Sequence, residues 1–177
     1  MPRKGNHTDR CHRLQSHDYR RPGFYFITTV TWGRLPLLAW RSGLNVKLTG
    51  FGRIVQVCWI EIPDHFPQVR LDAYVIMPDH FHGLLEMLEW SACGFQRKRY
   101  QADPCSHEAV RGISGTLTGS LGAIIGGFKS ASTRRINRAR GRVGEPVWQP
   151  SFHDHVVRSV TELERIRRYI ESNPARP

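Results

Sequence analysis

The sequence signals a β-hairpin in the stretch Arg70-Leu-Asp-Ala-Tyr-Val-Ile-Met-Pro-Asp-His-Phe-His-Gly-Leu-Leu-Glu-Met-Leu88. Residues 70–77 are rich in β-branched and other apolar residues and predict a strand. Pro78-Asp79 is a typical turn dipeptide, and residues 80–88 predict a second strand that pairs back on the first. The hairpin therefore supplies two neighbouring strands of a sheet.

Two histidines in this hairpin have the spacing of a metal site. Residues i and i+2 of a strand point to the same face, so we expect His80 and His82 side by side. Phe81 then points to the opposite face, into the core. An H-x-H pattern alone is a weak signal because surface histidines are common, and ordinary surface histidines are the alternative interpretation.

Strand and helix patterns continue on both sides of the hairpin. In chain order the sequence predicts a strand at 24–32, a helix at 49–62, strands at 70–77 and 80–88, a helix from Leu121, a strand at 148–157 and a helix at 161–172. This β-α-β-β-α-β-α order is that of a split βαβ unit with an added helix. The predicted fold is therefore α+β: a ferredoxin-like (RRM-like) antiparallel sheet with helices on one face and a C-terminal helix.

The last predicted helix carries the second candidate for chemistry. Thr161 and Glu164 match a capping box, which satisfies two backbone donors at a helix start. Tyr169 lies at the border of the apolar stripe, and Asn173 follows four residues later on the same side. An amphipathic edge residue with its hydroxyl in water is the alternative interpretation of Tyr169.

Charge and composition narrow the class of protein. The chain has 177 residues, 40% of them hydrophobic, which is enough for a single domain with a real core. Lys plus Arg number 26 against 15 Asp plus Glu, and this net charge of +11 points to a polyanionic partner. No apolar run reaches the roughly 20 residues of a membrane span, and the first residues do not resemble a secretory signal. We expect a cytoplasmic protein, associated with the nucleoid when DNA is bound, and no membrane partner.

We expect residues 1–20 to form a basic N-terminal arm and residues 21–177 a single domain. Residues 91–118 lack periodicity and predict a long loop inserted into that domain. For residues 1–12, a frayed tail and an arm that contacts phosphates both remain open. The cysteines Cys11, Cys58, Cys93 and Cys105 match no zinc-ribbon spacing, so we expect reduced thiols, with Cys58 in the core.

The H-x-H pair and the tyrosine of the last predicted helix indicate a specific chemistry when they are taken together. A divalent cation held by two neutral imidazoles and an amide oxygen could polarise a phosphodiester as a Lewis acid. A tyrosine hydroxyl nearby could then attack phosphorus and form a phosphotyrosine, which a 3′-hydroxyl can reverse. The sequence thus permits a covalent strand-transfer chemistry on DNA.

Four motif blocks, in order and correctly spaced, give the chain a specific resemblance to a known family. It resembles the IS200/IS605-like transposases, which are single-tyrosine HUH enzymes, and is most similar to their REP-associated tyrosine transposase branch. The blocks are Asp18-Tyr19 with Gly23 and Tyr25-Phe-Ile-Thr28, then Tyr74-Val-Ile-Met-Pro-Asp-His-Phe-His-Gly83, then Pro146-Val-Trp-Gln-Pro150 with Phe152-His-Asp-His155 and Val156-Val-Arg158, and Tyr169-Ile-Glu-Ser-Asn-Pro174. The resemblance covers most of the chain.

The resemblance implies a role for each matched residue. His80 and His82 correspond to the metal-binding histidines, and Asn173 to the amide that completes the site. Tyr169 corresponds to the nucleophile that becomes joined to the 5′-phosphate of cleaved DNA. The implied cofactor is Mg²⁺ or Mn²⁺, and the implied partner is single-stranded DNA with a hairpin, such as a repetitive extragenic palindrome. Relatives include monomers and dimers, so a homodimer is left open.

The chain departs from the family pattern in two places, and these departures leave other functions open. Asp79 stands where many relatives have asparagine, and the sequence ends three residues after Pro174, where many relatives continue. A catalytically inactive or domesticated binder of hairpin (REP-like) single-stranded DNA is therefore the main alternative. A small zinc-stabilised nucleic-acid adaptor is a third hypothesis.

Cations near the predicted helices are the candidates for DNA contact. A run without acidic residues extends from Lys129 to Arg142, and a solvated basic face is the alternative interpretation of it. The DNA-binding candidates are Lys129, Arg134, Arg135, Arg138, Arg165 and Arg168. His153 and His155 repeat the H-x-H pattern, and we expect His155 to lie behind the metal ligands or to face DNA.

Overall fold

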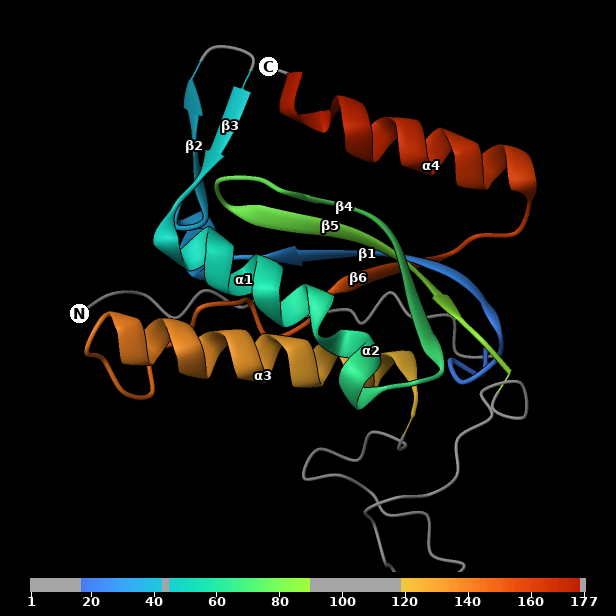
Figure 1. Ribbon diagram of the computed structural model, residues 1–177, viewed down its shortest axis with the longest axis horizontal. Coiled ribbons are helices and arrows are strands. Elements are labelled where there is room, and N and C mark those ends of the chain that lie inside the picture. Colours follow the sequence, from blue (N-terminus) through green and yellow to red (C-terminus); the bar gives the residue numbers. More distant parts are fainter. Residues whose placement is uncertain (1–16, 43–44, 90–118, 176–177) are drawn as a thin grey trace, which may run out of the picture.

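The computed structural model describes residues 17–42, 45–89 and 119–175. Four strands form an antiparallel sheet in the order β4-β5-β1-β6, and β2 and β3 form a separate hairpin (Figure 1). The elements are β1 (Gly23–Val30), a 3₁₀ turn (Trp32–Arg34), β2 (Ala39–Ser42), β3 (Asn45–Leu48), α1 (Gly50–Ile60), α2 (Ile62–His65), β4 (Val69–Ile76), β5 (His80–Met87), α3 (Leu121–Ala139), β6 (His153–Val156), α4 (Val160–Ser172) and a 3₁₀ turn (Asn173–Ala175). The predicted α+β class is confirmed, and the predicted elements occur in the expected order, with β2, β3 and α2 in addition.

Parts of the domain prediction lie outside the described residues. These are most of the 1–20 arm, the 91–118 insertion, and Cys11, Cys93 and Cys105. Cys58 is a buried free thiol on α1, as predicted.

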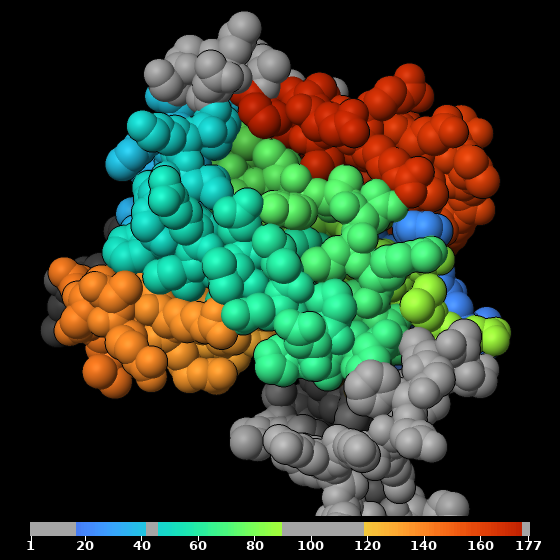
Figure 2. Space-filling view, viewed as in Figure 1, coloured from blue at the N-terminus to red at the C-terminus, as the bar shows by residue number. Residues whose placement is uncertain are grey.

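The helices lie on opposite faces of the sheet. Helices α1 and α3 pack together on one face, and α4 crosses the other face over β4 and β5 (Figure 1). In the space-filling view α4 likewise lies on the far side of the strands from α3 (Figure 2). Among the described residues, no helix combines the length and apolar character that crossing a bilayer requires.

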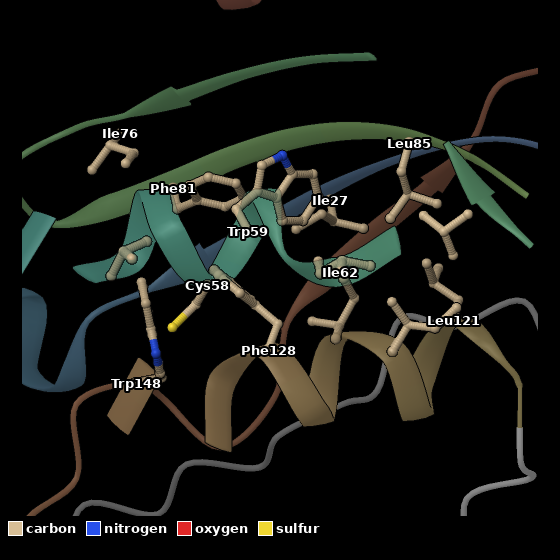
Figure 3. Packing of buried hydrophobic residues seen from close by; sticks show 14 of the residues in the cluster. Ile27, Cys58, Trp59, Ile62, Ile76, Phe81, Leu85, Leu121, Phe128 and Trp148 are labelled. Carbon is tan, nitrogen blue, oxygen red and sulfur yellow. The ribbon is translucent and has the colours of Figure 1, made fainter. Parts of the chain in front are cut away.

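The main core lies between the sheet and the α1–α3 pair (Figure 3). Its centre is an aromatic cluster in which the ring of Trp59 lies 4.8 Å from that of Phe81 and 5.5 Å from that of Phe128, centroid to centroid. Trp59 and Phe81 are fully buried. Such close aromatic packing fixes the side of β5 that faces α1.

Because Gly83 has no side chain, the ring of Trp59 can pack directly against β5 at this position. A Cβ atom at Gly83 would lie 2.6 Å from Trp59 Cη2 and 2.8 Å from Phe81 Cε1. Overpacking a well-filled core costs about 1–3 kcal/mol. We expect Gly83→Ala to lower the free energy of unfolding by this amount in urea denaturation. Gly126→Ala in α3 is the matched control, because nothing lies within 4 Å of its added Cβ; an equal loss in both variants would contradict the assignment.

A second, smaller core attaches α4 to the sheet. Leu163, Ile166 and Ile170 lie on one face of α4 and pack against Leu84 of β5. An ion pair adds to this contact, with Arg167 Nε donating to Asp72 Oδ1 of β4 at 3.0 Å. These contacts fix which side of α4 faces the sheet.

The structure corrects the start of the last helix. Ser159, not Thr161, is its N-cap, with the Ser159 hydroxyl accepting from the Glu162 backbone N–H at 3.2 Å. The Glu162 carboxylate accepts from the Arg158 backbone N–H at 2.8 Å. The predicted pair of Thr161 and Glu164 therefore lies inside the helix. The cap is formed two residues earlier, by Ser159 and Glu162.

Other boundaries also differ from the prediction. The β2–β3 hairpin and α2 were not anticipated, and Pro63 lies in the first turn of α2, where a missing N–H costs nothing. The fourth strand is shorter than 148–157, although Trp148 does form an isolated bridge to Thr31.

Candidate active site

Two imidazoles lie side by side at the start of β5. The ring centroids of His80 and His82 are 4.8 Å apart. Both rings are on the α4 face of the sheet, whereas Phe81 is fully buried on the α1 face. The predicted alternation of these three residues is therefore confirmed.

His82 is held by neighbours from β1. Its Nδ1 lies 2.7 Å from Thr28 Oγ1, and its ring stacks on Phe26 at a centroid distance of 5.3 Å. Burial, together with the positive charge of His80, lowers the pKa of His82 to about 4. The ring is thus neutral at physiological pH, and an Nδ1–H donated to Thr28 leaves a lone pair on Nε2.

His80 is held by the residue before it. Its Nδ1 lies 2.7 Å from Asp79 Oδ1, and since an ionised carboxylate only accepts, Nδ1 donates to it; in the neutral form of the ring, Nε2 then carries the lone pair. Burial raises the pKa of Asp79, but the hydrogen bond and charge of His80 and the charge of Arg34 outweigh it and leave the pKa below its usual value. Asp79 is therefore the oriented, ionised partner of His80.

Tyr169 of α4 lies directly over the buried imidazole. Its hydroxyl oxygen is 3.3 Å from His82 Nε2. The phenol ring makes edge contacts with His82 and Phe26, at centroid distances of 5.3 and 6.1 Å. Helix α4 thus brings a phenol hydroxyl within hydrogen-bond distance of His82 Nε2.

Asn173 is buried at the C-terminal end of α4. Its backbone N–H donates to the Ile170 carbonyl, and it begins a 3₁₀ turn that packs near β3. Within residues 17–42, 45–89 and 119–175, no hydrogen bond joins its amide to either imidazole. The structure therefore brings His80, His82 and Tyr169 together, and Asn173 lies one helical turn after Tyr169 without a hydrogen bond to either imidazole in the described part of the chain.

The donor set fits a divalent cation with open positions. Each imidazole has its Nδ1 engaged by a hydrogen bond, the arrangement that orients metal-binding histidines. In the described part of the chain no group of three or more His, Cys, Asp and Glu side chains could hold a metal by itself. Further ligands would have to come from an amide, from water or from substrate oxygens.

The predicted DNA-binding residues divide between the two faces of the sheet. On α3, the Lys129 ammonium donates to three backbone carbonyls of residues 149–151, Arg134 donates to Ser130, and Arg135 pairs with Glu61 at 2.7 Å. Arg138 is exposed on the same helix. These four cations lie on the face opposite the imidazoles, whereas Arg165 and Arg168 lie on α4 beside Tyr169.

His155 lies near Tyr169. It pairs across the strands with Phe26, and its Nε2 is 2.8 Å from Glu162 Oε1. Together with Phe26 and Tyr169 it lines an open cleft of about 670 Å³ between β6, β1 and α4. It therefore faces the cleft beside the tyrosine.

Three supporting residues were given no role by the sequence analysis: Phe26 and Thr28, which it noted only within a motif block, and Arg34. Thr28 and Phe26 reach His82 only because β1 and β5 pair with Thr28 opposite His82. The signal that could have found them is cross-strand register, which a single sequence does not specify. Arg34 follows β1 in a 3₁₀ turn, and its Nη1 lies 3.4 Å from Asp79 Oδ2.

Comparison with known proteins identifies a relative by sequence and a solved structure of similar fold. No family model matches the chain. A protein of Haemophilus influenzae, described as uncharacterized, is 33% identical over 170 residues, covering 96% of this chain and 90% of its own length. The structure of a REP-associated tyrosine transposase bound to a REP hairpin is similar with a TM-score of 0.57 and 18% identity, over 92% of this chain and 71% of that one.

The crystal structure of a protein of Deinococcus radiodurans R1, described as a putative transposase, matches 93% of this chain and 100% of its own length, with a TM-score of 0.48 and 18% identity. The resemblance read from the motifs is thus confirmed at the level of the fold. The chain belongs to one family with the H. influenzae protein, and its fold is that of a REP-associated tyrosine transposase.

Proposed function

We propose that this protein is a metal-dependent DNA transposase that binds structured single-stranded DNA and cleaves and rejoins it through a 5′-phosphotyrosine. One observation carries the proposal: the Tyr169 hydroxyl lies 3.3 Å from Nε2 of His82, whose ring adjoins that of His80. The site thus combines a hydroxyl that can act as a nucleophile with two imidazoles oriented by hydrogen bonds. This combination suits phosphoryl transfer.

His80 and His82 would hold the cation, Mg²⁺ or Mn²⁺, with Asn173 as the expected third ligand. When bound, such an ion polarises a phosphodiester oxygen as a Lewis acid. The protein's own part is to fix the two rings through Thr28 and Asp79 and to keep His82 neutral by burial. Neutral ligands leave the full charge of an ion available to a phosphate.

Tyr169 performs the covalent step. Attack by its hydroxyl oxygen forms the Oη–P bond and breaks the P–O3′ bond, the phenolic proton is released, and the departing 3′-oxygen is protonated. Resealing reverses these changes when a 3′-hydroxyl attacks the phosphotyrosine. The rings of Phe26 and His82 hold the phenol over the site before DNA arrives.

Hairpin-containing single-stranded DNA is the proposed substrate. The transposase of similar fold is bound to a REP hairpin. The net charge of +11 favours a nucleic acid, and Arg165 and Arg168 place two guanidinium groups beside the tyrosine. The α3 cations, on the other face, stay candidates for contact with a DNA stem.

The direct test is formation of a covalent adduct with a labelled hairpin oligonucleotide in Mg²⁺ or Mn²⁺. We expect a protein–DNA species that survives denaturing gels in metal and vanishes in EDTA, while the melting temperature stays close to that with metal. Hairpin binding without any adduct would favour the inactive binder. Retained zinc, with loss of the fold on chelation, would favour the adaptor.

Asp79 gives a prediction for the metal site. Removing the partner of a metal-binding histidine typically costs 10–100-fold in metal affinity, and we expect about this loss for Asp79→Ala. Asp79→Asn should lose less, because its amide oxygen can accept the same Nδ1–H. Calorimetric titration with Mn²⁺ measures both variants, and equal affinity in Asp79→Ala and the wild type would contradict the role.

A further inference from the structure

The cleft beside Tyr169 is a feature to which the proposed covalent step gives no occupant. It holds about 670 Å³ and is lined by Phe26, His155, Arg165, Ile166, Arg168, Tyr169 and Ser172. A volume of this order is usual for ligand sites, which run roughly 300–1,000 Å³. The imidazole pair is not part of its lining, so the tyrosine ring lies at its border with the metal site.

The lining has two different kinds of surface. The β1 and β6 side offers aromatic rings, since Phe26 and His155 are direct cross-strand neighbours. The α4 side adds the aliphatic Ile166 and the phenol ring of Tyr169. Flat π-surfaces stack nucleobases with little regard to sequence.

Positive charge accompanies the rings. Arg165 and Arg168 lie one helical turn apart, and both are exposed. No acidic side chain is among the residues that line the cleft. Glu162, which contacts the lining residue His155, also accepts the Arg158 backbone N–H. Its carboxylate lies 3.7 Å from Arg165 Nη2, so it offsets part of the charge of one of the two arginines.

From this combination we infer that the cleft binds one unpaired nucleotide of the DNA strand, with its base among the rings and its phosphate at the arginines. The inference rests on the proposed function, because that supplies DNA as the ligand. Since Tyr169 borders the cleft and also carries the attacking hydroxyl, the nucleotide is adjacent to the scissile phosphate. The cleft therefore selects an unpaired base at that point and excludes a continuous duplex.

The test is equilibrium binding of the full-length protein to a fluorescent hairpin oligonucleotide in EDTA, where no cleavage occurs. Single abasic nucleotides replace each unpaired position of the oligonucleotide in turn. Stacking on aromatic side chains contributes enough that we expect one position next to the scissile phosphate to bind about tenfold more weakly when abasic. A flat profile across all positions would overturn the inference without the need for any variant.

A cleft-filling variant localises the effect. Ser172 is exposed at the end of α4 and lines the cleft, so Ser172→Phe occupies it without removing a core side chain. We expect Ser172→Phe to weaken binding of the intact oligonucleotide about as much as the abasic change does, and to abolish the response to that change. Ser172→Ala is the matched control and should keep the wild-type profile.

Outcomes for the cleft and for the chemistry are separable. A position-specific profile that Ser172→Phe removes supports the cleft even if no metal yields an adduct, which would refute only the proposed function. Adduct formation with a flat profile refutes only the cleft. A profile that persists unchanged in a folded Ser172→Phe would place the base elsewhere and also overturn the inference.

Discussion

Tyr169→Phe is expected to eliminate the covalent DNA adduct while the protein still binds the hairpin. Phenylalanine keeps the ring that contacts Phe26 and His82 and removes only the hydroxyl oxygen 3.3 Å from His82 Nε2. Without that oxygen no Oη–P bond can form. Denaturing gels with a labelled oligonucleotide measure the adduct, and a mobility-shift titration in parallel measures binding.

Tyr74→Phe is the matched control. Tyr74 lies on β4, where its ring stacks on Phe81 on the opposite face of the sheet and its hydroxyl accepts from Gln56. This variant should form the adduct at the wild-type level. Adduct formation by Tyr169→Phe would show that another nucleophile acts and would end the assignment.

The second large effect concerns the imidazoles. A bound metal ion stabilises developing charge by several kcal/mol, so His80→Ala and His82→Ala should each slow adduct formation about a thousandfold or more. Binding of the hairpin in EDTA should change little. His153→Ala, an exposed histidine of the other H-x-H pair on β6, should react like the wild type.

Stability separates the two histidine variants. His82 is 7% exposed, stacks on Phe26 and bonds Thr28, so its removal leaves a cavity and an unpaired hydroxyl. We expect His82→Ala to lose about 1–3 kcal/mol of unfolding free energy and His80→Ala, at the partly exposed end of the strand, less. Urea titrations measure both. Loss of hairpin binding in parallel with activity would instead make the histidines structural.

Elements with a strong periodic pattern were predictable from the sequence. The β5 motif, β4, and the apolar faces of α1 and α4 each carry several residues at one spacing, and the structure places them within one or two residues of the prediction. The β2–β3 hairpin has only four residues in each strand, too few for alternation to be recognised. The helix at 49–62 was predicted to end before Pro63, although proline also suits a first helical turn, which is its position in α2.

The histidines and the tyrosine of the site were predictable from the sequence, but the residues that hold the imidazoles in place were not. Alternation along β5 is a local property, so the placement of His80 and His82 followed from their spacing alone. The contacts of Thr28, Phe26 and Arg34 depend on how β1 pairs with β5 and on the turn after β1. Asp79 was visible in the sequence, but its hydrogen bond to His80 Nδ1 depends on side-chain rotamers.

Because side chains alternate between the two faces of β5, its register against β1 decides which residues enter the core. Sliding this strand by one residue against β1 would push two polar rings into the aromatic centre and turn Phe81 toward the phenol of α4. Such a slipped form would lose both its hydrophobic packing and the grouping of His80, His82 and Tyr169. The same pairing of β5 with β1 that fills the core therefore also places His80 and His82 on the α4 face.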